Sequence, residues 1–145
     1  PLFIYAAVCQ VELKVLADNQ IVRDSYKKGY DSIIIFEGMI AQFHEMARNL
    51  FNGTKYERSD EEYYENTLMI KGAMHACLTE MSFRRPISLP RSRERLIRMA
   101  CEMFGTKKEA AEIASKIREY GSIWEDIGVE LVEKPISSLP CEYEF

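Results

Sequence analysis

Residues 2–17 carry apolar side chains at the spacing of a helix. Steps of three and four positions place them on two parallel stripes, so such a helix has only a narrow polar side. The first stripe consists of Leu2, Ala6, Cys9, Leu13 and Leu16, and the second of Ile4, Val8, Val11 and Val15. We therefore expect a helix that is largely buried, either in the centre of a bundle or in an interface such as a homodimer.

The helical period continues through residue 51. After the break "DNQ" at 18–20, a short second helix is expected to run to Lys28, and Gly29 is typical of a helix C-terminus. "SIIIF" at 32–36 alone favours a strand, but the longer period predicts a helix over residues 31–51 that ends at Asn52-Gly53. The expected core positions of this helix are Ile33, Phe36, Ile40, Phe43, Ala47 and Leu50.

Two capping boxes mark later helix starts. Ser59 with Glu62 predicts a helix over residues 60–83, and Thr106 with Glu109 predicts another that continues to about residue 120. In each box the Ser or Thr side chain accepts a hydrogen bond from the backbone N–H three residues later. The expected core face of the first of these helices consists of Ile70, Met74, Cys77 and Met81.

The segment between the two boxes contains prolines. Pro86 and Pro90 cannot both lie inside a helix, so we expect a connector there and a fifth helix near residues 92–104. This helix is expected to bury Leu96, Met99 or Ala100, and Met103. After the last helix, "SIWEDIG" forms a final turn, and residues 129–145 are expected to be an extended tail.

These segments predict an all-α fold, an irregular bundle of five or six helices with an extended C-terminal tail. The 145 residues match the commonest size of one domain, so residues 1–145 are interpreted as a single helical domain. Because the chain begins at Pro1 rather than Met, we expect it to be excised from a longer chain. Removal of an initiator Met is the alternative.

Composition narrows the class of protein. Apolar residues make up 47% and charged residues 29%, as in ordinary globular domains. No apolar run reaches the 18 or more residues of a membrane span, so no membrane partner is expected. The four cysteines are scattered without a CxxC pair, which favours a reduced intracellular protein of the cytoplasm or nucleus.

Charge is distributed unevenly along the chain. The net charge is −4, yet residues 84–118 contain ten Lys or Arg and four Glu, whereas residues 121–145 contain six acids and one Lys. Arginine can grip phosphate or carboxylate with two hydrogen bonds. The candidate residues for binding nucleic acid or an acidic partner are Arg84, Arg85, Arg91, Arg93, Arg95, Arg98, Lys107 and Lys108. The alternative is a solvated helix face whose charges pair with the acidic tail.

The order of segments in residues 84–120 resembles a ribbon-helix-helix DNA-binding unit, with a short strand-like segment, a helix, a Gly-Thr turn and a second helix. This resemblance implies DNA binding by a dimer. Pro86 lies where the ribbon would pair with its dimer mate, and proline removes a hydrogen-bond donor at that point.

Signals for chemistry are few. The only histidines are His44 and His75, and neither belongs to an HExxH pattern. His75 and Cys77 would point about 200° apart on a helix, so they cannot easily share one metal ion. No GxSxG, P-loop or GxGxxG motif occurs. We expect no enzyme, cofactor, metal or small-molecule substrate. A site built from residues distant in sequence stays open as an alternative.

Aromatic residues supply the remaining candidates. "EEYYE" is expected to expose at least one of Tyr63 and Tyr64, and Trp124 lies between the last helix and the tail. Such residues are frequent anchors in protein interfaces, although they are also frequent in cores. The sequence therefore predicts a helical interaction or regulatory module that binds a protein partner or self-associates. Nucleic-acid binding through residues 84–98 is the alternative.

Overall fold

The structure is a computed structural model that describes the backbone of residues 1–82 and 89–133, and the side chains of residues 1–80 and 91–121. Six helices and no strand occupy this part of the chain, which confirms the predicted all-α fold. They are α1 (Leu2–Asp18), α2 (Gln20–Gly29), α3 (Ile33–Phe51), α4 (Asp60–Ser82), α5 (Leu89–Glu102) and α6 (Lys107–Glu133). Most of the strand-like segment of the predicted DNA-binding unit, residues 84–90, lies outside the described residues, but its last two residues, Leu89 and Pro90, are helical and belong to α5.

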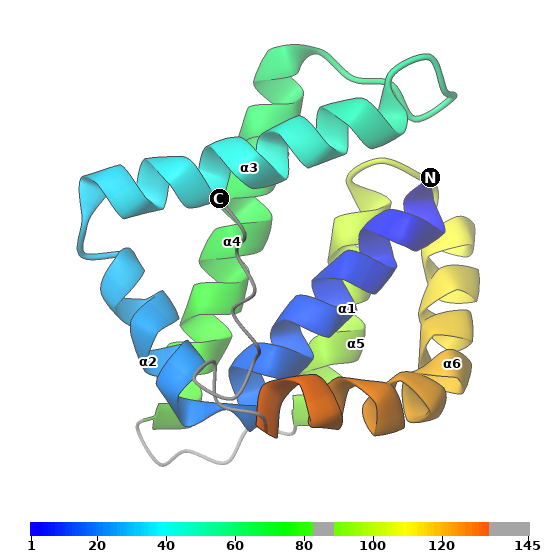
Figure 1. Cartoon of the computed structure of the whole chain (residues 1–145). Coiled ribbons are helices and arrows are strands. Elements are labelled where there is room, and N and C mark those ends of the chain that lie inside the picture. The colour runs from blue at the N-terminus through cyan, green and yellow to red at the C-terminus, as the bar shows by residue number, and fades with distance from the viewer. Residues whose placement is uncertain (83–88, 134–145) are drawn as a thin grey trace, which may run out of the picture.

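Helix α1 is central to the bundle. It contacts each of the other five helices, and Figure 1 shows it running between α4 and α6. Its first apolar stripe is fully buried, as predicted. The second stripe is only partly covered, because Val8 and Val15 are half-buried while Ile4 and Val11 are 53% and 49% exposed. The prediction of a largely buried helix therefore holds for one of its two stripes.

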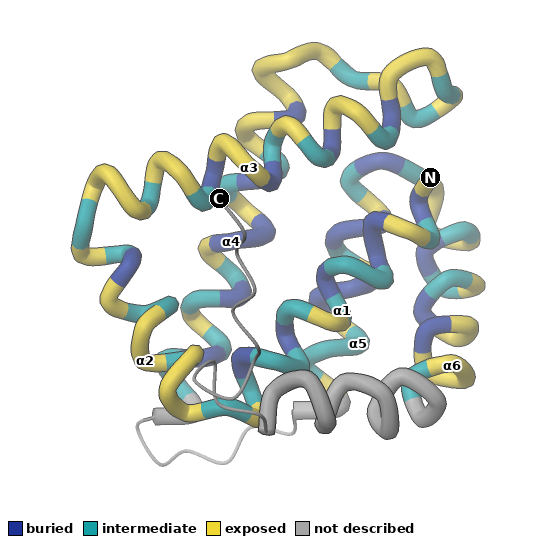
Figure 2. Tube along the Cα trace, viewed as in Figure 1, coloured by how far each residue is buried: buried dark blue, intermediate teal, exposed yellow. Residues whose placement is uncertain are grey.

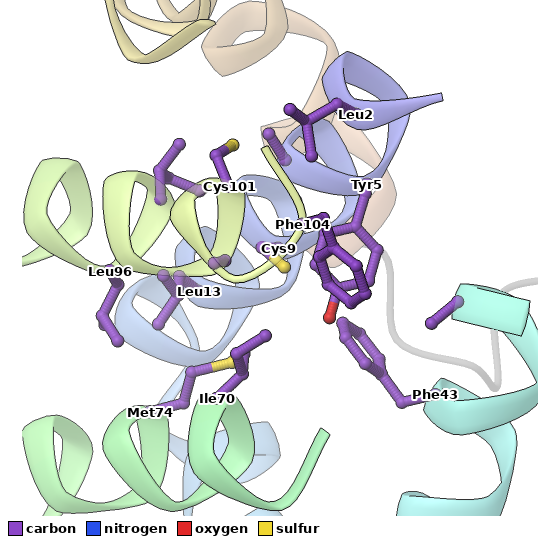
Figure 3. Packing of buried hydrophobic residues seen from close by; sticks show 14 of the residues in the cluster. Leu2, Tyr5, Cys9, Leu13, Phe43, Ile70, Met74, Leu96, Cys101 and Phe104 are labelled. Atoms are coloured by element: carbon purple, nitrogen blue, oxygen red, sulfur yellow. The ribbon is translucent and has the colours of Figure 1, made fainter. Parts of the chain in front are cut away.

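An aromatic cluster connects three helices in the core. Tyr5 of α1 lies against Phe104, which follows α5, and against Phe51 at the end of α3, with ring centroids 5.2 and 5.3 Å apart. Phe51 and Phe104 stack at 4.3 Å. Figure 3 shows Tyr5 and Phe104 side by side, with Phe43 of α3 approaching from the opposite helix. Burial of these large rings supplies much of the apolar driving force for folding.

Both predicted capping boxes are confirmed. The Ser59 hydroxyl accepts a hydrogen bond from the Glu62 N–H, and the Glu62 carboxylate accepts one from the Ser59 N–H. Thr106 and Glu109 make the same reciprocal pair at the start of α6. The boxes satisfy N–H groups that the first helical turn leaves without partners.

Two predicted helix boundaries are wrong. Helix α5 begins at Leu89 rather than near residue 92, so Pro90 lies in its first turn, where the missing N–H breaks no intrahelical bond. Helix α6 continues through Gly121 to Glu133 instead of ending near residue 120. Figure 1 shows that α6 bends where its colour passes from yellow to orange, and Gly-Ser pairs such as 121–122 are common kink sites.

Candidate interaction surfaces

The junction of α2 and α3 exposes three consecutive isoleucines. Ile33, Ile34 and Ile35, here called the isoleucine corner, are 66%, 79% and 53% exposed. The expectation that Ile33 joins the core is wrong. The first buried residue of α3 is Ile40, further along the helix. Figure 2 shows exposed residues along the outward side of this corner.

The corner is held in place by close packing against α2 and by contacts of Tyr30, the residue after α2, with α4. A side chain at Gly29 would approach Ile35 Cγ2 to 3.1 Å, so the absence of one lets α2 and α3 meet closely. The Tyr30 hydroxyl donates to the Lys71 carbonyl at 2.9 Å, and the Tyr30 ring stacks on His75 at 4.0 Å. The isoleucines are therefore presented from a supported junction rather than from an isolated loop.

The outer face of α3 continues from the corner. Gly38 and Ala41 are exposed, and a side chain built at Gly38 would have nothing within 4 Å. A shallow open depression of about 430 Å³ lies along the second half of the helix. Its lining residues are Gln42, Glu45, Met46, Asn49 and Leu50.

The structure describes only part of the predicted arginine-rich surface. Arg91, Arg95 and Arg98 are exposed at helical spacing along one side of α5, here called the arginine ladder, whereas Arg93 is half-buried. Arg84 and Arg85 lie outside the described residues. Lys107 and Lys108 are exposed, but they stand at the start of the following helix, α6.

Acidic residues interrupt this positive surface. The Arg118 guanidinium lies 3.5 Å from the Glu94 carboxylate, which joins α6 to α5. Glu102 is exposed one turn beyond Arg98. Glu94 and Glu102 therefore offset part of the positive charge on this side of α5.

Of the two adjacent tyrosines, one is buried and the other is exposed. Tyr63 is 1% exposed and its hydroxyl lies 3.3 Å from Asn52 Oδ1, so its prediction as a surface contact is corrected to a core position. Tyr64 is 46% exposed, as expected for at least one member of the pair. The Trp124 side chain lies outside the described residues.

A partly buried ion pair joins α1 to α4. The Lys71 ammonium donates to the Glu12 carboxylate, and the Lys71 side chain is 5% exposed. Its Nζ also lies 4.1 Å from the centroid of the Phe43 ring, an arrangement that stabilises a cation. Sequence reasoning missed this pair, although a lysine within the apolar run "MIKGAM" was the available signal.

Within the described residues, the cysteines and histidines form no assembled chemical site. Burial raises the pKa of Cys9 well above the ordinary thiol value and that of Cys101 to about 12, so both stay protonated and unreactive near neutral pH. Among the described side chains, no group of three or more His, Cys, Asp or Glu residues is placed to hold a metal ion. Within the same residues, no helix has the length and apolarity needed to cross a membrane.

Comparisons with known proteins add no relationship. No family model matches the chain, and neither a curated protein nor a solved structure shows significant similarity to it.

Proposed function

We propose that this chain is a helical interaction module that binds a protein partner through the isoleucine corner. The observation that carries the proposal is the exposure of three consecutive isoleucines, by 53–79%, at a supported helix junction. Burying one such side chain contributes about 1.5–3 kcal/mol relative to leaving it in water. Contiguous exposed apolar residues are typical of interaction sites, whereas isolated ones need no explanation.

The half-covered stripe of α1 is the competing surface. Ile4 and Val11 lie seven positions apart and are separated by half-buried residues, so they present two isolated contacts. The isoleucine corner instead presents three consecutive exposed isoleucines, two of which are more exposed than either residue of α1. The corner is therefore the better candidate for a docking site.

Site-specific photo-crosslinking tests this function. A photoreactive phenylalanine analogue at position 34 of the full chain, expressed in its native cells, should yield one covalent product of discrete mass. The matched control places the same analogue at Ser115, which is exposed on α6. Equal labelling from both positions, or none from position 34, would contradict the proposal.

A second candidate function is binding of a phosphate polymer by the arginine ladder. Arg91, Arg95 and Arg98 recur every three or four residues on one helix side, which spaces them by about 4.5–6 Å along the axis. Three phosphate contacts to a single strand imply a salt slope near −2 in log–log form, from about −0.7 per contact.

Single-stranded RNA titrated against the full chain at 50 and 200 mM salt tests this second candidate. Replacing the three arginines by glutamate should abolish binding, while Lys116→Glu on the neighbouring helix should change it little. No binding at 50 mM salt, or a salt-independent affinity, would exclude it.

A further inference from the structure

We propose that the partner seated on α3 is a second copy of this chain, with the two α3 helices antiparallel about a two-fold axis. This inference rests on the proposed interaction function and specifies its partner. It is carried by two features of one helix that complement each other. The isoleucine corner projects at the start of α3, and the open depression lies along its second half.

Of the three isoleucines, Ile35 lies on the same flank of the helix as the depression. At about 100° per residue, Ile35 falls within roughly 60° of Gln42, Met46 and Asn49 around the helix axis. When two antiparallel helices are related by a two-fold axis perpendicular to both, the same flank of each helix lies on the same side of the pair. Residues on that flank of one copy therefore face the same flank of the other copy. Ile35 of each copy therefore faces the depression of its partner.

The positions along the axis also match. Eleven residues separate Ile35 from Met46, which is about 16 Å at 1.5 Å per residue. A two-fold axis near Ile40 then brings Ile35 of one copy level with Met46 of the other. Both contacts form at once, so the association is closed and stops at a dimer.

Two small residues lie near the expected crossing point. Gly38 and Ala41 flank the expected two-fold position and are both exposed. Nothing lies within 4 Å of a side chain built at Gly38, so the surface above it is open. Small residues at a crossing allow two helix axes to approach within about 8–10 Å.

Charges on the other flank are compatible with this arrangement. Glu37 and Arg48 are both exposed and lie within about 20° of each other around the axis. The same two-fold axis brings Glu37 of one copy within about 6 Å, along the helix, of Arg48 of the other. Arg48 also lies 3.7 Å from Asp60 in its own chain, so it would be shared between the two carboxylates.

The size of the contact sets the expected strength. The matched face spans residues 34–49, about 22 Å of one helix, which is well below the roughly 800 Å² per partner of a standard stable interface. We therefore infer a reversible dimer that dissociates on dilution rather than an obligate one.

Complementation between two variants tests the arrangement. Ile35→Lys alters the projection, and Gln42→Glu alters the depression, so each variant alone should be monomeric by light scattering at 1 mM. Their equimolar mixture should recover dimer, since one contact is unaltered and the other pairs Lys with Glu. Ile21→Lys is the matched control, because Ile21 is 79% exposed at the start of α2 and should leave the dimer intact. Circular dichroism and thermal melting confirm that each variant is folded.

The outcomes separate this inference from the function on which it rests. A wild-type chain that stays monomeric at 1 mM overturns the second copy as partner, and a position-34 photo-crosslink to a different protein would still uphold the interaction function. A wild-type dimer that survives both single variants, or variants whose mixture fails to associate, overturns the antiparallel α3 contact. If the photoreactive residue at position 34 also yields no crosslink, the proposed interaction function is excluded as well.

Discussion

Glu12 and Lys71 should contribute unequally to stability, although they form one ion pair. The Lys71 side chain is 5% exposed, whereas that of Glu12 is 24% exposed. Removing Glu12 leaves an ammonium group enclosed by α1, α3 and α4 without its counter-charge. Removing the Lys71 ammonium leaves a carboxylate that can still reach water. The Glu12→Ala change should therefore destabilise the protein more than Lys71→Met.

The magnitudes follow from the burial of each group. Removing one partner of a buried ion pair costs about 3–5 kcal/mol, and we expect Glu12→Ala to fall in that range. At about 2–4 °C per kcal/mol for a protein near this size, its melting temperature should fall by about 6–20 °C. Lys71→Met keeps most of the side-chain volume and should cost about 1 kcal/mol. The double change Glu12→Leu with Lys71→Met should be close to neutral, as apolar replacements of buried pairs often are.

Urea unfolding followed by far-ultraviolet circular dichroism measures these differences. Linear extrapolation gives the free energy of unfolding for the wild type, the two single variants and the double variant. An unchanged slope with urea shows that the denatured state is comparable in all four proteins. If Glu12→Ala costs less than Lys71→Met, the reasoning from unequal burial is refuted.

Two further predictions concern Glu109 at the start of α6 and the glycines at positions 105 and 72. The Lys55 ammonium and the capping contacts lower the pKa of Glu109 to about 2. The ionised Glu109 therefore stabilises the fold above the unfolded pKa near 4.3, and this stabilisation is lost as pH falls from there toward 2. Glu109→Gln should reduce the acid dependence of the melting temperature between pH 5 and 2, and an unchanged profile would contradict this prediction. Gly105→Ala should destabilise the protein by about 1–3 kcal/mol, because the added carbon meets Leu2 Cδ2 at 2.8 Å. Gly72→Ala within α4 should instead stabilise it by up to about 1 kcal/mol, because the added carbon has nothing within 4 Å. Equal urea midpoints for the two variants would contradict this contrast.

The helices were predictable because their signals are local. The apolar period of α1 and the two capping boxes depend on residues within a few positions of each other, and the structure has them as expected. The end of α6 was not predictable in this way. An isolated glycine costs about 1 kcal/mol within a helix, so Gly121 weakens the helix without ending it.

The candidate site was harder to predict. Apolar period shows which residues share a face of α3, but it does not show how far the neighbouring helices extend. Ile33 belongs to the predicted core face and is nevertheless 66% exposed. Tyr63 and Tyr64 show the same limit, since adjacent residues of one type point in different directions and only the packing of the bundle separates core from surface.

The central claim is that the exposed face of α3, including the isoleucine corner, is an interface between two copies of this chain. Sedimentation equilibrium of the wild-type chain between 10 μM and 1 mM tests it most directly. A reversible dimer predicts a weight-average mass that rises with concentration from the monomer value of 16.9 kDa toward twice that mass. A mass that stays at 16.9 kDa over the whole range would contradict it.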